Sequence, residues 1–387
     1  MEIGLPYISL FSGSGGLDLA AEHATDPPLT QPYRHAENGQ LLATSVMVEW
    51  GKEEVETLRA NFAAPVLAGD ICEIGTNEIL KEGGLKRGEA TLVVGGPPCT
   101  PFSKSGFWLD YKREGRDPNA SLLDEYARVV EESKPEAFVM ENVQGLTYRT
   151  HKEQFSQLLE RLGRAGYNPR WKLLNAAEYG VPQLRKRVFV VGRRDGLAFE
   201  FPSTTHSGWS EHSKKIDMSK NPFVTCGEVL KDLLPGETEA GDVVEGTWAS
   251  VAARIPPGQN YLYFSERGPE ETLWKWRSRY WTFLLRLDPD RPASTLQAQP
   301  GPWVGPFHWE NVPNDDGETR ARRLRVPEML RLMTFPDNYQ LTGDRRAVQR
   351  QLGNAVPVEF GKVVIRSLME QLGHLERDES LQSHLPV

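Results

Sequence analysis

The stretch from Ala90 to Ser103 constrains the fold of this chain more than any other. It passes from a β-branched apolar segment, residues 90–94, into Gly95-Gly96-Pro97-Pro98-Cys99. The apolar segment predicts a buried strand, the glycines end it, and the prolines stiffen the turn that follows. In open α/β sheets, ligands and chemistry gather at the carboxyl ends of the strands. A lone cysteine is most often a small buried apolar residue, but in such a turn we expect Cys99 to be a nucleophile.

The composition limits the class of protein. A chain of 387 residues can bury a large core, and we expect two domains. No apolar run approaches the ~18 residues of a membrane helix, and no segment resembles a signal peptide. The three cysteines, Cys72, Cys99 and Cys226, have no metal-ligand spacing, so a reducing, cytoplasmic setting without structural metal is expected.

The net charge of −8 argues against a polyanionic partner, but the basic residues are clustered. Residues 183–194 hold five basic side chains and no acid, and residues 318–350 hold eight arginines against four acids. A local basic face could therefore bind nucleic acid on an acidic protein.

Three further predicted strands end in turns suited to a nucleoside. Residues 7–11 lead into the glycine-rich turn 12–18 and a helix near Leu17–Glu22, residues 44–48 lead to Glu49-Trp50, and residues 66–68 lead to Gly69-Asp70-Ile71. A glycine-rich turn alone is as often an ordinary tight turn, and Trp50 is as often a core residue as a flat surface for a purine ring. Three such strand ends together predict a nucleoside pocket. Residues 23–40 are interpreted as an inserted loop.

The next segments predict a second group of polar residues at the same edge. A polar loop, 104–119, is long enough to close over a substrate, and a helix near Leu122–Glu132 precedes a strand, 137–140, that ends in Glu141-Asn142. An amphipathic helix is expected over 155–165. Strands over 172–176 and 188–192 flank residues 183–187, where strand spacing points Arg185 and Arg187 the same way. They suit a phosphate or a base carbonyl; the alternative is a solvated edge strand.

From about Phe201 the chain becomes irregular, rich in proline and glycine, and holds seven of the ten tryptophans up to residue 320. We interpret 201–320 as a separate domain, between a domain over 1–200 and a C-terminal segment, 321–387. As a strand, Trp274–Tyr280 would turn aromatic rings to a core and cations to phosphates; the alternative is a charged solvent face. Helices are expected over 326–334 and 358–372.

In this order the stretches resemble the motifs of the DNA (cytosine-5)-methyltransferases, over nearly the whole chain. Leu10–Gly16 is similar to the S-adenosylmethionine turn of that family, and Glu49-Trp50 and Asp70-Ile71 are similar to its ribose and adenine contacts. Pro97-Pro98-Cys99 resembles its nucleophile motif, Glu141-Asn142-Val143 its base-gripping motif, and Gln183–Arg187 its paired-arginine motif. Arg291–Leu296 resembles the motif that packs the recognition domain, and Gln351–Val356 resembles the C-terminal motif that returns to the cofactor pocket.

The resemblance implies a Rossmann-like α/β methyltransferase sheet with a smaller, irregular and β-rich target-recognition domain. It implies methyl transfer from S-adenosyl-L-methionine to C5 of a cytosine flipped out of a specific double-stranded DNA sequence, through a bond between Cys99 and C6. The implied catalytic residues are Cys99, Glu141, Arg185 and Arg187. The implied cofactor-binding residues are Phe11, Gly13, Gly15, Gly16, Leu17, Glu49, Trp50, Asp70, Ile71, Pro97, Leu122, Asn354 and Val356. It further implies a monomer without metal, in a restriction-modification system that can include a cognate endonuclease.

Two positions depart from the family pattern, since Thr100 stands where many members carry glutamine and Asn119 where arginine is usual. A tRNA cytosine-5 methyltransferase is the nearest alternative, but the roughly 120-residue segment before Arg320 is more useful for reading a DNA site. A catalytically inactive DNA-binding module is disfavoured by the presence of Cys99, Glu141 and Arg187. A nicotinamide oxidoreductase would explain neither Cys99 nor the paired arginines.

Overall fold

The computed structural model describes residues 4–26, 41–98, 121–208, 216–233, 241–275, 281–313 and 317–376. Cys99, the loop 104–119, residues 27–40 of the predicted insertion and residues 276–280 lie outside the described residues. Within these ranges, no helix has the length and apolar character needed to cross a membrane.

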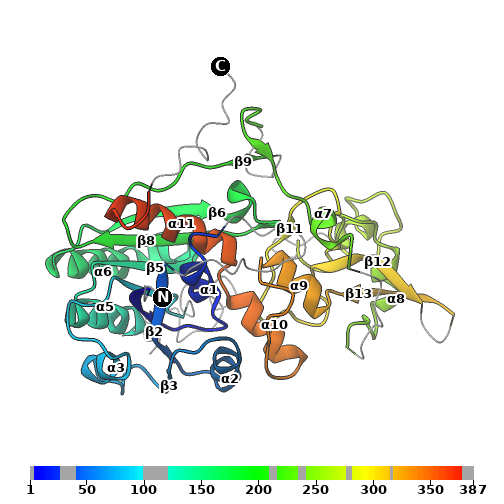
Figure 1. Ribbon diagram of the computed structural model, residues 1–387. Coiled ribbons are helices and arrows are strands. Elements are labelled where there is room, and N and C mark those ends of the chain that lie inside the picture. Colours follow the sequence, from blue (N-terminus) through cyan, green and yellow to red (C-terminus); the bar gives the residue numbers. More distant parts are fainter. Residues whose placement is uncertain are drawn as a thin grey trace.

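A seven-stranded mixed sheet forms the centre of the larger part of the molecule (Figure 1). Its strands are β1 (Leu5–Leu10), β2 (Leu42–Glu49), β3 (Val66–Ala68), β4 (Leu92–Gly95), β5 (Ala137–Val143), β6 (Arg170–Asn175) and β8 (Lys186–Arg193). The order is β3-β2-β1-β4-β5-β8-β6; neighbours are parallel except that β8 runs antiparallel to β5 and β6. The expected Rossmann-like α/β sheet is therefore confirmed. Because β8 is antiparallel, its first residues lie at the edge where the parallel strands end.

Helices cover both faces of the sheet. They are α1 (Gly16–Glu22), α2 (Lys52–Asn61), α3 (Thr76–Glu82), α5 (Ser121–Ser133), α6 (Lys152–Arg164) and α11 (Val358–Leu372). Since side chains alternate along a strand, Ile8 and Phe138 pack in one cluster with residues of α3, α5 and α6. Their neighbours Tyr7 and Val139 pack in another with residues of α1 and α11.

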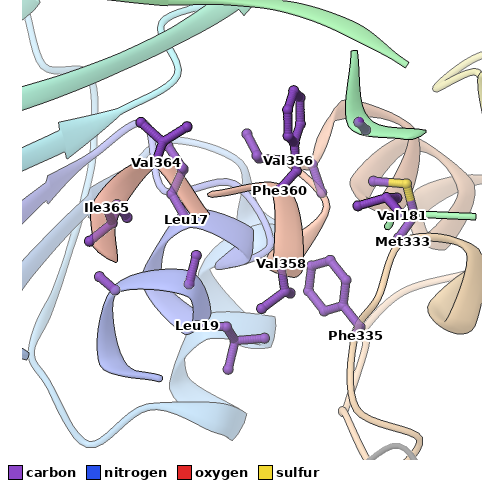
Figure 2. Packing of buried hydrophobic residues seen from close by; sticks show 14 of the residues in the cluster. Leu17, Leu19, Val181, Met333, Phe335, Val356, Val358, Phe360, Val364 and Ile365 are labelled. Atoms are coloured by element: carbon purple, nitrogen blue, oxygen red, sulfur yellow. The ribbon is translucent and has the colours of Figure 1, made fainter. Parts of the chain in front are cut away.

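The last helix returns to the first, as Figure 2 shows. Leu17 and Leu19 of α1 share a buried cluster with Val364 and Ile365 of α11. The helices approach closely because Gly361 has no side chain: a Cβ there would lie 2.8 Å from Cβ of Ala20. Each fully buried aliphatic side chain contributes about 1.5–3 kcal/mol. This packing fixes the turn before α11, which reaches the carboxyl edge of the sheet.

The segment after residue 201 divides between two cores. Its elements are β9 (His206–Ser207), β10 (Asn221–Pro222), α7 (Cys226–Leu230), α8 (Ala249–Arg254), β11 (Ala293–Ser294), β12 (Phe307–Pro313) and β13 (Thr319–Arg323). A separate small core is formed by Val244, Ala252, Ile255, Tyr261, Phe264, Leu284, Phe307 and Ala321. Trp274 packs against it, and the rest of the predicted strand 274–280 from residue 276 on lies outside the described residues. In contrast, α7 and β11 contribute to the cluster that holds Tyr7, Val139 and residues of α1 and α11, which we call the main core. Strand β11 pairs with β7 (Gln183–Leu184).

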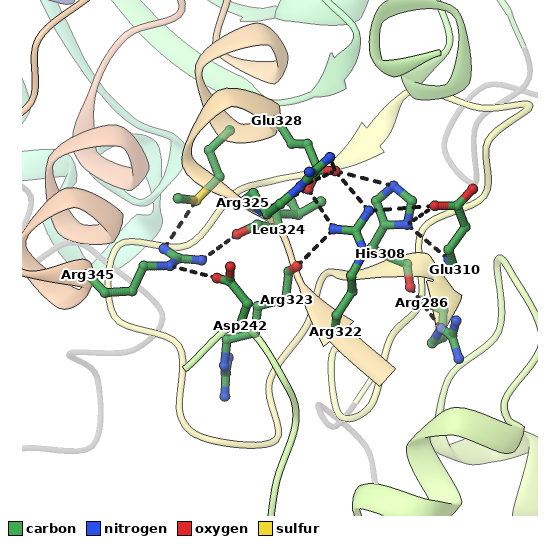
Figure 3. Close-up of polar contacts among 11 residues, drawn as sticks. Asp242, Arg286, His308, Glu310, Arg322, Arg323, Leu324, Arg325, Glu328 and Arg345 are labelled. Carbon is green, nitrogen blue, oxygen red and sulfur yellow. Dashed lines mark hydrogen bonds and ion pairs between the residues drawn. The ribbon is translucent and has the colours of Figure 1, made fainter. Parts of the chain in front are cut away.

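Buried ion pairs join the small core to the helices that follow it, α9 (Val326–Leu332) and α10 (Arg345–Asn354) (Figure 3). Glu328, only 1% exposed, accepts hydrogen bonds from Arg322 at 2.8 and 2.9 Å and from Arg325 at 2.9 Å. Arg345 pairs with Asp242 at 3.3 Å. Separating a pair would leave a buried charge without its counter-charge, which is strongly unfavourable. The pairs therefore hold the small core in a defined arrangement against α9 and α10.

The expectation of a basic face over 318–350 is wrong for most of that run. Besides the arginines of this network, Arg331 pairs with Asp232 and Asp337, and Arg350 pairs with Glu53 and Glu54. The sequence interpretation counted only acids within the run, whereas folding brings most of the counter-charges from elsewhere in the chain.

Candidate active site

A cavity of about 470 Å³ opens at the carboxyl edge of the sheet. Its volume lies in the range typical of small-molecule sites. It is lined by the ends of the parallel strands, the start of β8 and the turn between α10 and α11. Of the predicted cofactor-binding residues, those that line it are Phe11, Gly13, Gly16, Leu17, Glu49, Trp50, Asp70, Ile71, Pro97, Leu122, Asn354 and Val356. Glu141 and Arg187 line the same cavity.

The glycine-rich turn after β1 lines the cavity next to the start of α1. Gly16 allows the C-terminal motif to approach, since a Cβ there would lie 2.3 Å from the carbonyl oxygen of Val356. Gly15, the remaining predicted cofactor-binding residue, is not among the residues that line the cavity. Its φ is 78°, and a Cβ would lie 2.6 Å from the ring of Phe62, so this glycine serves the turn and its packing.

Glu49 at the end of β2 is held by backbone donors. The N–H groups of Gly13, Trp50 and Gly51 donate to its carboxylate at 2.7, 2.9 and 2.8 Å. Burial raises the pKa of Glu49, and these hydrogen bonds oppose that rise. The carboxylate thus ties the glycine-rich turn to β2 and keeps further lone pairs that can accept from hydroxyl groups.

Trp50 and Asp70 stand at the rim and wall on the same side. The indole of Trp50 is 74% exposed, which excludes core packing as the reason for a tryptophan at this position. Asp70 accepts from the backbone N–H of Cys72 at 2.9 Å, and Ile71 beside it is buried. A flat apolar ring next to a polar side chain suits a purine base.

A buried carboxyl–guanidinium pair occupies the other end of the cavity. Nε of Arg187 lies 2.8 Å from Oε1 of Glu141, and their side chains are 12% and 8% exposed. The pair forms because β8 is antiparallel to β5, which places Arg187 opposite Val143. Burial raises the pKa of Glu141, while the charge of Arg187 opposes that rise. Glu141 can therefore hold a proton more readily than an exposed glutamate.

Asn142 connects this pair to the rigid turn after β4. Its side-chain amide donates to the carbonyl oxygen of Pro97 at 3.2 Å, and it is buried. Gly96 lies against Glu141, because a Cβ there would be 3.3 Å from Oε2. The turn that leads into Cys99 is thus fixed by the residues flanking it at the end of β5.

Arg185 does not share the position of Arg187. It lies between β7 and β8, is completely buried, and is absent from the cavity lining. Its guanidinium donates to the carbonyl oxygens of Leu296 at 3.2 Å, Gly353 at 2.8 Å and Ala355 at 2.8 Å. The two arginines therefore differ in their partners: Arg185 binds backbone carbonyl groups and Arg187 pairs with Glu141, although the charges of both oppose the rise in the pKa of Glu141.

Several cavity residues were not predicted from the sequence. They are Ser9, Ser12, Asp18, Glu54, Arg350 and Gln351, among others. The one signal in the sequence for these residues is their closeness to the motifs. Arg350 directly precedes the C-terminal motif, and Glu54 lies shortly after Trp50, in the first turn of α2. In the described ranges, no group of three or more His, Cys, Asp or Glu side chains is placed to hold a metal ion.

The sheet order and the strand-end cavity define an α/β enzyme of the Rossmann-like methyltransferase class. The family model for C-5 cytosine-specific DNA methylases matches residues 5–370, and the chain belongs to that family. It is therefore a DNA (cytosine-5)-methyltransferase, of a family whose methyl donor is S-adenosylmethionine.

Individual relatives agree with this assignment. The Type II methyltransferase M.SacI of Streptomyces achromogenes is 62% identical over 377 residues, covering 97% of this chain and 95% of that protein. The Type II methyltransferase M.BbvI of Brevibacillus brevis is 30% identical over 385 residues, covering 95% and 91%. Among solved structures, the S. pombe Dnmt2 methyltransferase matches with a TM-score of 0.61 at 16% identity, covering 96% of this chain and 99% of that one; this likeness concerns the fold.

Proposed function

We propose that this chain is the methyltransferase of a Type II restriction-modification system and acts as a monomer on duplex DNA in the bacterial cytoplasm. The proposal rests on one observation above all: a single cavity joins the predicted nucleoside residues to the buried Glu141–Arg187 pair. The similarity to M.SacI and M.BbvI supports the assignment to such a system.

The residues of the cavity fit S-adenosylmethionine, which supplies a methyl group on an electrophilic sulfonium sulfur. Glu49 would accept from the ribose hydroxyls, and Trp50 would stack on the adenine. Asp70 and Ile71 would face its amino edge. Asn354 and Val356 also line the cavity, where they would hold the remainder of the molecule.

The chemistry on the cytosine falls to Cys99, Glu141 and Arg187. A thiolate at Cys99 adds to C6, and the electron pair this places on the ring makes C5 nucleophilic. Protonated Glu141 donates to N3 and accepts from the exocyclic amine, which offsets the charge gained by the ring. Arg187 donates to O2. After C5 takes the methyl group, C5 loses its hydrogen as a proton to water and the C5–H electron pair re-forms the C5=C6 double bond. The sulfur leaves C6 as the Cys99 thiolate, and N3 returns its proton to Glu141.

This geometry cannot be reached by a stacked base, so the target cytosine must leave the duplex. Cys99 directly follows Pro98, which lines the cavity. We therefore expect the flipped cytosine to bind between that turn and Glu141.

The test of the proposal is a covalent trap. Incubation with cofactor and random duplex DNA, followed by bisulfite sequencing, first identifies the methylated site; tRNA treated in parallel should stay unmethylated. A duplex with 5-fluorocytosine at that site should then stall after methyl transfer, because fluorine cannot leave as a cation. We expect a protein–DNA adduct that survives denaturation and shifts on a gel.

Matched variants identify the attacking thiol. Cys99→Ala should abolish the adduct and turnover but retain cofactor binding, and Glu141→Gln should slow trapping because an amide supplies no proton to N3. Cys72→Ser and Cys226→Ser should trap like the wild type. An adduct that persists in Cys99→Ala would refute the assignment of the nucleophile.

A further inference from the structure

An ion-pair cluster bridges two walls of the cavity without belonging to either predicted set of site residues. Nε of Arg350, in α10, lies 3.1 Å from Oε1 of Glu54, in α2. Its Nη2 lies 3.2 Å from Oε2 of Glu53 and 3.3 Å from Oε2 of Glu54. Glu54 is 8% exposed, and both Arg350 and Glu54 line the cavity. One guanidinium thus holds two carboxylates across nearly 300 residues of chain.

The cluster lies beside the residues that would contact the cofactor. Residues three or four apart on a helix share a face, so Arg350 lies one turn before Asn354 on α10. On the other side, Glu54 sits against Gly51, where a Cβ would lie 2.2 Å from Oε2, and Trp50 precedes that glycine. Holding Arg350 to Glu54 therefore fixes the wall that carries Trp50 relative to the wall that carries Asn354.

A second connection ties the same two helices together away from the charges. Oγ1 of Thr57 donates to Oε1 of Gln351 at 2.7 Å, and Nε2 of Gln351 donates to the carbonyl oxygen of Thr342 at 2.7 Å. These groups are buried or partly buried, whereas the side chains of Arg350 and Glu53 are 32% and 42% exposed. If the outer ion pairs open, these neutral hydrogen bonds keep the helices attached at Thr57, and only the start of α2, which carries Glu53 and Glu54 and follows Trp50, is released from Arg350.

We propose that Arg350, Glu53 and Glu54 form an ionic clasp between α2 and α10, two helices that contribute to the lining of the cavity, and that this clasp sets how fast the cofactor and its demethylated product leave. The inference rests on the proposed binding of S-adenosylmethionine in this cavity. Arg350 acts as a positioning residue: it holds Trp50 and Asn354 at a fixed separation and need not touch the ligand. Because the pairs are partly exposed, salt weakens the clasp.

The test measures dissociation of S-adenosylhomocysteine by stopped-flow displacement. In the wild type, the dissociation rate should rise as NaCl increases from about 0.05 to about 0.5 M, because screening opens the clasp. Arg350→Gln should release the ligand about three- to tenfold faster at low salt and lose most of the salt dependence, as expected for loss of partly exposed ion pairs. Arg350→Lys should restore part of the wild-type rate.

The matched control is Arg346→Gln, an exposed arginine on the same helix, which should behave like the wild type. The double variant Glu53→Gln, Glu54→Gln should reproduce the effect from the α2 side, which covers the case in which Arg350→Gln does not fold. Equal dissociation rates and salt slopes in wild type and variants would overturn the clasp alone. If the wild type itself fails to bind S-adenosylhomocysteine, the cofactor proposal falls, and the clasp with it.

Discussion

Asp18 shows how a single buried residue beneath the cofactor turn can set the pH response of the protein. It is completely buried in α1 and lines the cavity. Burial raises the pKa of Asp18 to about 7 from its ordinary value of 3.8; a hydrogen bond with Ser9 opposes this, and the charge of Glu22 adds to it. The hydroxyl of Tyr7 lies 3.5 Å from Oδ1. At neutral pH the folded protein therefore keeps part of a proton that the unfolded chain has lost.

We expect Asp18→Asn to become increasingly stabilising relative to the wild type as the pH rises from about 4 to about 7. Below about pH 4 Asp18 is protonated in both the folded and the unfolded state. Above about pH 7 the difference in stability between the variant and the wild type is constant. The free energy of unfolding of the wild type therefore falls, through Asp18, only between these two limits. The gain of the variant at high pH should be on the order of a few kcal/mol.

Urea unfolding of both proteins at a series of pH values measures this gain. Asp290→Asn, at an exposed aspartate, is the control and should give a curve parallel to the wild type. If Asp18→Asn also runs parallel to the wild type throughout, the buried carboxyl does not hold the proton.

At the scale of elements, Arg185 connects three segments that carry separate parts of the site. It reaches residues near β11 and the turn between α10 and α11 from the start of β8. The same turn carries Asn354, and β8 carries Arg187. Arg185 therefore fixes the segment that carries Asn354 relative to the strand that carries Arg187.

We expect Arg185→Gln to lose about 2–4 kcal/mol of stability, because it removes several buried hydrogen bonds and leaves carbonyl oxygens unpaired. Affinity for S-adenosylhomocysteine and turnover should fall together. Arg187→Gln should instead lower turnover with little change in affinity. Urea unfolding, calorimetric titration and methylation assays separate the two. If Arg185→Gln keeps full stability and affinity but loses turnover, Arg185 acts directly on the base, as the sequence predicted.

At the scale of the whole molecule, the two cores predict how sequence specificity can be transferred. Residues 201–320 are proposed to read the DNA site, but β11 and Leu296 within this range belong to the main core and bond to β7 and Arg185. Exchange of the entire range should therefore disturb the catalytic core. A chimera that keeps residues 287–298 native preserves those contacts.

We expect this second chimera, built with the segment of a family member that methylates a different sequence, to methylate the donor's site. Its turnover should exceed that of the chimera with the whole range exchanged. Bisulfite sequencing of random DNA measures the site for both. An active chimera that keeps the original site would contradict the proposed division of labour.

Much of the fold and of the site follows from the sequence. Apolar segments that end in Glu49, Asp70, Gly95 and Glu141 determined the strands, and the carboxyl ends of parallel strands necessarily meet at one edge. The helix over 358–372 was predicted with the bounds of α11. Helices α2, α3 and α10 could not be predicted in the same way, because they are short, mostly polar stretches whose few apolar residues form no long helical stripe. The identities of the residues were enough to indicate the family.

What only the tertiary structure decided is how side chains from distant segments pair. Arg185 and Arg187 are equivalent in the sequence, yet one is buried against backbone carbonyls and the other faces Glu141. The sequence alone suggests that the arginines of 318–350 form a basic face. In the folded protein, carboxylates from elsewhere in the chain pair with arginines of this segment. Local patterns determine strands and helices because those depend on near neighbours. The partner of a charge depends on which segments the packed core brings within about 4 Å, which no local pattern records.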